Sequence, residues 1–137
     1  MASAAYHYAL QAALKADLDW DTVTVKVMLV TSTYTVDKDH DFRNDITNEV
    51  SGTGYSAGGT AATCTVTRDT ANDRIDISLG SASWASSTIT ARGAVYYVAR
   101  GGASSADEVI AYIDFGADIT STAGTFSLTA STLRFAF

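Results

Sequence analysis

Hydrophobic residues recur along this chain with two different periods, and the first of them lies at the start. In residues 4–18, Tyr6, Leu10, Leu14 and Leu18 stand four apart, which places them along one stripe of a helix. A helix of about 15 residues is marginal in water unless its apolar side is packed, so an arm that orders on a partner is the alternative. The pattern predicts a short N-terminal helix or arm over residues 1–18.

From residue 23 the period becomes two, with Val23, Val25, Val27 and Leu29 on one face and polar residues between them. Strand-like segments rich in β-branched or aromatic residues follow at residues 61–68, 74–79, 91–99, 108–115, 125–129 and 132–137. About seven short strands predict an all-β fold, an antiparallel β-sandwich of jelly-roll or immunoglobulin-like type.

Two connections shape this prediction. The turn at residues 69–73 has hairpin chemistry, because Asn72 or Asp73 can adopt the left-handed conformation. Residues 36–60 form a long polar loop with a short helix-compatible piece at 41–46. We therefore expect one β domain over residues 1–137, with the sandwich in residues 19–137.

Composition narrows the function classes. The chain has 137 residues, of which 47% are hydrophobic and 18% charged, with a net charge of −6. Nine scattered Lys and Arg residues make no basic patch, so a nucleic-acid partner is not expected. No run of apolar residues is long enough to cross a membrane, and the first residues lack the pattern of a signal peptide. The single cysteine, Cys64, lies in an alternating segment and is expected to be a small core residue.

The glycine-rich run at residues 54–58 matches the G-x-S-x-G motif of α/β hydrolases, with Ser56 in the position of the nucleophile. The two histidines, His7 and His40, precede Ser56, whereas in these hydrolases the histidine follows the serine. The run also lacks the lysine and the following helix of a phosphate-binding loop. We predict no enzyme activity and no cofactor.

Carboxylates alternate in the long loop at Asp37, Asp39 and Asp41, with Asp45 and Glu49 nearby. Calcium prefers six to eight oxygen ligands and is one hypothesis for this cluster. Solvated turns and helix caps are the other, and it is the commoner reason for such residues. We predict no metal site.

Four aromatic residues, Trp20, Trp84, Tyr96 and Tyr97, have two alternative roles, which are sugar binding and packing in the core or at a subunit contact. Exposed aromatic rings can bind sugars. The run 94–98 is apolar on both faces, however, which favours a central strand or a subunit contact.

The chain resembles a family of short virion structural proteins of tailed bacteriophages. The resemblance extends from residue 19 to residue 116. It rests on Trp84 and on the stretches DW (19–20), VMLVTSTYTVD (27–37), HDF (40–42), NEVSGTGYSAGG (48–59), ITAR (89–92) and IDFG (113–116). One departure is Val36, because the family pattern usually has proline there.

This resemblance implies a particle structural protein with no catalytic motif. Our expectation is a capsid decoration or cement protein on the head surface, made in the host cytoplasm, that binds the major capsid protein and forms a homo-oligomer, with a trimer as the first expectation. The alternatives are a tail or head-to-tail connector component and a carbohydrate-binding adhesion module. The candidate assembly residues are Tyr6, Leu10, Leu14, Trp20, Tyr55, Tyr96, Tyr97, Phe135 and Phe137.

Overall fold

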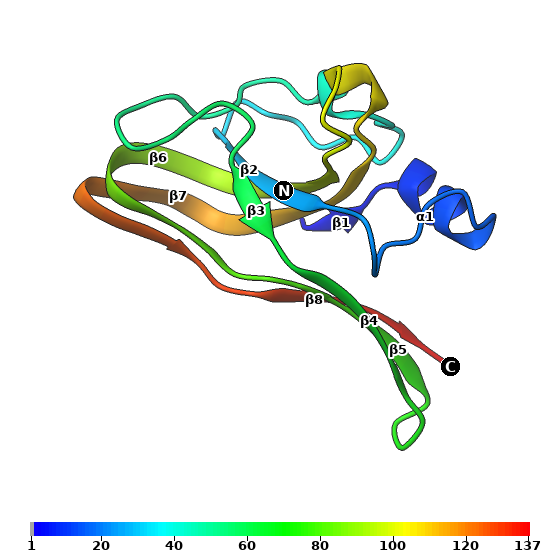
Figure 1. Ribbon diagram of the computed structural model, residues 1–137. Helices are drawn as coiled ribbons and strands as arrows, with labels where there is room; N and C mark the ends of the chain where they lie inside the picture. Colours follow the sequence, from blue (N-terminus) through cyan, green and yellow to red (C-terminus); the bar gives the residue numbers. More distant parts are fainter. Residues whose placement is uncertain (1) are drawn as a thin grey trace.

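Two antiparallel sheets make up most of the structure, a computed structural model that describes residues 2–137 (Figure 1). Met1, at the start of the predicted arm, lies outside the described residues. The first sheet has the strand order β1 (Ala4–Ala5), β7 (Val109–Leu128), β6 (Ala82–Val98), β2 (Val25–Val30) and β3 (Thr60–Ala62). The second has the order β4 (Cys64–Asp69), β5 (Arg74–Leu79) and β8 (Ser131–Ala136). The predicted all-β, sandwich-like fold with a short N-terminal helix is confirmed.

The N-terminal helix α1 (His7–Leu14) is shorter than the predicted segment. It ends early because Ala16 adopts a positive φ of 62°, after which the Asp17 and Leu18 amides donate to the Ala12 carbonyl. Buried Ala9 and Ala12 hold the helix on the rest of the chain. No helix in residues 2–137 is long and apolar enough to span a membrane.

The hairpin of β6 and β7 is the longest element and differs most from the prediction. Residues 82–90 belong to β6, and β7 is one strand where the sequence predicts two. The register between the two strands shifts at four places, and the first shifts lie on either side of Ser87. These bulges bend the two long strands, so that the hairpin is not flat along its length.

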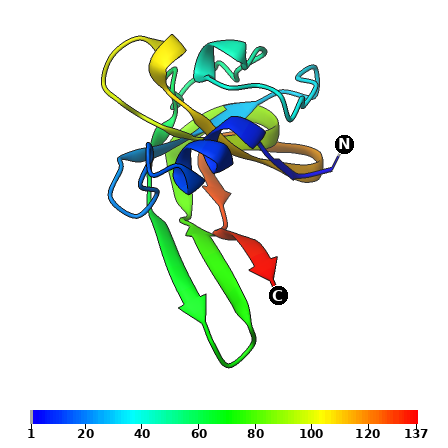
Figure 2. The same cartoon turned by 90° about the vertical axis from the view of Figure 1, so that its right-hand side faces the viewer.

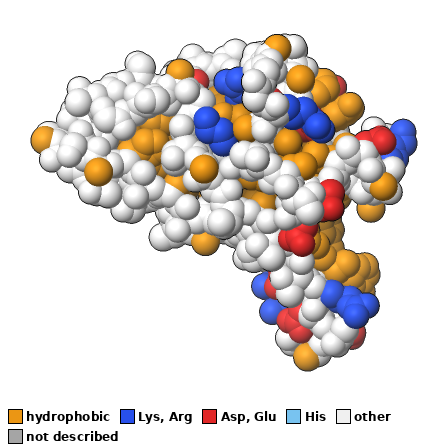
Figure 3. Space-filling model, viewed as in Figure 1, with side chains coloured by type: hydrophobic (Ala, Val, Ile, Leu, Met, Phe, Trp, Pro, Cys, Tyr) orange, Lys and Arg blue, Asp and Glu red, His pale blue; other side chains and the backbone are white. Residues whose placement is uncertain are grey.

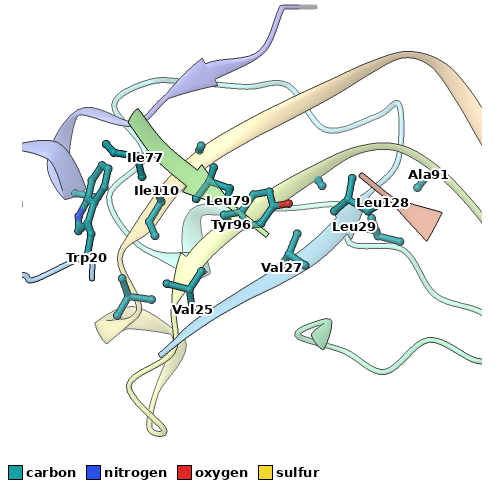
Figure 4. Packing of buried hydrophobic residues seen from close by; sticks show 14 of the residues in the cluster. Trp20, Val25, Val27, Leu29, Ile77, Leu79, Ala91, Tyr96, Ile110 and Leu128 are labelled. Atoms are coloured by element: carbon teal, nitrogen blue, oxygen red, sulfur yellow. The ribbon is translucent and has the colours of Figure 1, made fainter. Parts of the chain in front are cut away.

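The core lies between the two sheets, where side chains from β2, β5 and β6 converge (Figure 4). Val27 and Leu29 of β2 share a face with Tyr96 of the neighbouring strand β6, and this face packs against Leu79 of β5 in the second sheet. The Tyr96 hydroxyl donates to the Gly80 carbonyl at 2.7 Å, which satisfies its polar atom inside the core. A second apolar cluster, on the other face of β2 and β6, includes Met28, Val30, Tyr34, Val95, Tyr97 and Tyr112. The central strands are therefore buried on both faces.

Loops at one end of the molecule are fixed by partly buried ion pairs. A 3₁₀ helix, η1 (Arg43–Asp45), lies in the long loop, and a second, η2 (Ser104–Ala106), lies between β6 and β7. Arg43 Nε contacts Asp107 Oδ2 at 3.0 Å, and Arg100 forms a two-pronged pair with Glu108. Asp107 and Glu108 are both buried, so these pairs compensate charges that would otherwise be costly to bury.

The second sheet projects from the rest of the molecule, as Figures 1 and 2 both show. Its hairpin turn agrees with the prediction, because β4 and β5 pair antiparallel and Asp73 has a φ of 50°. Asp69 accepts hydrogen bonds from the backbone and side chain of Asn72 and so closes the turn. The projecting part carries the surface described next.

Candidate assembly surface

An apolar groove of about 350 Å³ lies between α1 and the projecting sheet. The helix contributes Leu10, Ala13 and Leu14, and Trp20 follows it in the chain. The sheet contributes the side chains of one face, which are Val66, Ile75, Ile77, Phe135 and Phe137. All nine lining residues are apolar, so the groove offers contact area without a polar anchor.

The strand register explains why these side chains share a face. Val66 lies opposite Ile77, and Ile75 lies opposite Phe135, so alternate residues of all three strands point to the same side. Ile77 is buried in the core, because the part of the sheet nearest the body is covered by the first sheet. Toward the tip this cover ends and the apolar face is open to solvent. Figure 3 shows hydrophobic side chains along this flank of the projection.

Two side chains at the groove are unusually exposed for their type. Leu14 is 80% exposed and Phe137 is 85% exposed, while Val66 on β4 is 40% exposed. Isolated exposed apolar residues are common on proteins, but three around one groove form a patch. A patch of this kind is typical of an interaction surface.

The opposite face of the same sheet is polar and internally paired. Asp76 Oδ1 accepts from Arg134 Nε at 2.7 Å, and Asp76 Oδ2 lies 3.3 Å from Arg74 Nε. The Arg134 guanidinium lowers the pKa of the Asp76 carboxyl. Arg74 also contacts Asp69 at 3.0 Å. The charged side chains of this face pair with one another and stay hydrated. The apolar face of the sheet is therefore the side that is available for assembly.

The nine residues predicted for assembly fall into three groups. Tyr6, Trp20, Tyr96 and Tyr97 are buried within the chain, so their packing stabilises the subunit itself. Tyr55 is partly buried and packs against the core, where its hydroxyl donates to Glu49 Oε1 and accepts from the Leu29 amide of β2. The remaining four, Leu10, Leu14, Phe135 and Phe137, line the groove together with the buried Trp20. The sequence pattern shows no link between them, and it missed Val66, Ile75 and Ile77.

The glycine-rich loop with the serine motif is anchored to the sheet. Glu49 Oε1 accepts from the Tyr55 hydroxyl at 2.7 Å and from the Gly58 amide at 2.6 Å. Ser56 is exposed in a turn, where its carbonyl accepts from the Gly59 amide at 3.0 Å. The Ser56 side chain stands in a surface turn and not on a strand-to-helix elbow.

Both histidines are engaged away from that loop. His7 Nδ1 lies 2.9 Å from Asp39 Oδ1, and His40 Nδ1 lies 3.1 Å from the Tyr34 hydroxyl. Neither is hydrogen-bonded to Ser56 among the bonds of the described residues. Among the described residues, neither histidine is therefore placed to act as a base for Ser56.

The carboxylates of the long loop are distributed over separate turns. Asp37 accepts from the Asp39 amide, and Asp45 accepts from the amides of Asp41 and Phe42, which together lower the pKa of Asp45. In residues 2–137 no three His, Cys, Asp or Glu side chains come together in a group that could hold a metal ion.

Cys64, at the start of β4, is partly buried. Burial, with a smaller contribution from the negative charge of Asp21, raises the pKa of its thiol to about 11. The thiolate is therefore scarce at neutral pH, and a nucleophilic role is disfavoured.

Comparison with protein-family models, with curated proteins and with solved structures gave no match.

Proposed function

We propose that this chain is a structural subunit of a bacteriophage particle, bound as a decoration protein to the outside of the head shell. The partner in this proposal is the major capsid protein. The resemblance to virion structural proteins indicates the kind of particle. The apolar groove between α1 and the projecting sheet is the observation that carries the proposal.

The groove supports assembly because its exposed side chains are costly to leave in water. Fully burying a leucine or phenylalanine side chain contributes roughly 1.5–3 kcal/mol, and both Leu14 and Phe137 are mostly exposed. A partner that covers the groove would gain this free energy. The net charge of −6 is compatible with an outer surface and not with a DNA-facing one.

The carbohydrate-binding alternative has little structural support. Trp20, Trp84, Tyr96 and Tyr97 are all buried, so none of them offers an open ring face for a sugar. A glycan array that gave a specific signal would reopen this alternative.

The experiment is binding of the purified chain to heads that lack it, measured by co-sedimentation and by imaging of the particle. We expect binding across the shell and greater resistance of the shell to heat. The variant Leu14→Asp should weaken binding by about tenfold or more, because it places a charge in the groove.

The matched control is Ile119→Asp, which changes another exposed side chain that lies outside the groove. This variant should bind like the unchanged chain. Absence of binding to heads contradicts the proposal. Density at a single vertex would instead place the chain on the tail or the connector.

A further inference from the structure

The outer edge of β8 presents unpaired backbone groups. The Phe137 amide donates inward to the Asp73 carbonyl at 2.9 Å, so Phe135 and Leu133 also point their backbone groups toward β5. The alternate residues Thr132, Arg134 and Ala136 then point theirs outward. No hydrogen bond within residues 2–137 uses these outward groups.

The opposite edge of the same sheet is partly closed. The Val66 amide, which points outward from β4, donates to Asp21 Oδ1 at 2.9 Å. In the first sheet, the edge strands β1 and β3 have two and three residues. An open edge strand of six residues is a template for another strand, and β8 offers such an edge beside the apolar face of the projecting sheet.

We propose that two copies of this chain pair through β8, antiparallel, about a two-fold axis at Phe135. In this register Phe135 faces Phe135 of the second copy, and Leu133 faces Phe137 of the second copy. Arg134 lies opposite Ala136, and their outward backbone groups form the hydrogen bonds between the copies. β8 is thus complementary to β8 of the second copy, both in the side chains on its two faces and in the backbone groups along its edge.

Two other registers fit less well. A two-fold axis at Arg134 sets two arginines directly opposite each other, which is unfavourable. An axis at Leu133 leaves Phe137 opposite Thr129, so the most exposed ring of the chain gains no apolar partner. The axis at Phe135 avoids the charge repulsion and covers Phe137.

Pairing through β8 joins the two projecting sheets into one sheet of six strands. The apolar faces become continuous, with one α1 helix over each half. Because the contact uses the same strand from both copies, it closes on itself as a dimer. A trimer would need β8 to meet a different surface. The inference rests on the strand edge alone and does not depend on the shell proposed above.

The first test is the oligomeric state of the full chain, measured by sedimentation over a range of concentrations. We expect a dimer. Ala136→Pro removes an outward donor from β8 without touching the pairing with β5, and should weaken the dimer by about tenfold or more. The matched control is Arg68→Pro, at an outward-facing position of the β4 edge, which should leave the dimer intact.

The second test is disulfide formation, which shows directly which residues of the two β8 strands lie opposite each other. In a Cys64→Ala background, Phe135→Cys places two thiols at the two-fold axis, where facing residues are close enough for a disulfide. Phe137→Cys is the control, because residue 137 faces Leu133 in this register. We expect rapid crosslinking of Phe135→Cys and slow crosslinking of Phe137→Cys.

Both tests can overturn the inference. A monomer or a trimer contradicts it, as does a dimer that Arg68→Pro disrupts and Ala136→Pro does not. Circular dichroism of each variant separates a lost contact from a lost fold. Shell binding by a monomer would contradict the pairing and leave the proposed function standing.

Discussion

Gly59 precedes β3, where the backbone passes very close to β2. Its φ is 74°, and a Cβ atom there would overlap the backbone carbonyl of Val27. Gly101, in the loop between β6 and β7, has a similar φ of 82° but nothing within 4 Å of a Cβ position. The two glycines therefore separate the cost of a left-handed backbone from the cost of a steric clash.

This contrast gives a prediction for two substitutions. Gly101→Ala should lower the free energy of unfolding by about 1–2 kcal/mol, which is the cost of the backbone conformation. Gly59→Ala should lower it by more than about 3 kcal/mol, because β2 lies inside the sheet and cannot yield. Urea denaturation measures both, and equal losses would contradict the close approach at Gly59.

The sequence shows where glycine permits a positive φ but not the close contact of Gly59 with β2. Glycine adopts a positive φ without steric cost, and Gly52, Gly54, Gly58 and Gly59 all have one. Which of these glycines touches another strand depends on tertiary pairing, and one sequence contains no information about that pairing.

At the scale of elements, the bend of the β6 and β7 hairpin depends on Ser87. Its hydroxyl oxygen lies 2.7 Å from Ser121 Oγ and 3.0 Å from the carbonyl oxygens of Trp84 and Gly124. Ser87 has one proton to donate to the carbonyls, so Ser121 is the donor between the two serines. Both serines are buried, and together they satisfy the backbone at the bulge.

Ser87→Ala should therefore lower the free energy of unfolding by about 1–3 kcal/mol, since it leaves buried polar groups without partners. The double variant with Ser121→Ala should lose less than the sum of the two single variants, because the serines share one network. Ser83→Ala, at an exposed position of the same strand, is the control and should change little. Additive losses at positions 87 and 121 would contradict the shared network.

The same bulge explains why the sequence failed to predict the first half of β6. Trp84, Ser87 and Ile89 are buried, but the irregularity shifts the alternation of apolar residues, so no regular strand pattern remains. In β7, residues 116–120 are all exposed and show no alternation of buried and exposed side chains, so one long strand resembles two. By contrast, β5 and the β4–β5 turn follow local rules and were predicted correctly.

For the whole molecule, the response of stability to pH follows from its buried hydroxyl and thiol groups. Burial raises the pKa of Tyr96 to about 12 and that of Cys64 to about 11, and it also raises the pKa of Tyr6, Tyr34 and Tyr55. The unfolded chain releases these protons at lower pH than the folded chain does. The stability that these groups contribute is therefore fully present below about pH 9 and is lost as the pH rises toward 12.

At acid pH the dependence is opposite, because stability is lost as the pH falls. The lowered pKa values of Asp45 and Asp76 contribute stability that is present above about pH 4 and is lost as the pH falls through those values. Denaturation midpoints between pH 3 and pH 11 would measure both limbs. Tyr96→Phe should make the alkaline limb shallower, and constant stability up to pH 11 would contradict the argument.

The groove is a property of the whole chain, and this limits what sequence reasoning can find. The pattern marked Leu10 and Leu14 as one side of a helix, and Phe135 and Phe137 as one side of a strand. About 120 residues separate the two pairs, and only the packing of α1 beside the projecting sheet brings them together. Whether these residues are exposed likewise depends on how far the first sheet covers the apolar face of the projecting sheet.

The loop of Gly101 and Gly102 lies at the end of the molecule away from the projecting sheet (Figure 1). A Cβ atom at either position would meet no atom within 4 Å, so this loop is a suitable place for inserted residues. If the groove binds the shell, a foreign peptide inserted there would point outward and be repeated wherever the subunit binds. The chain would then serve as a carrier for multivalent antigen display.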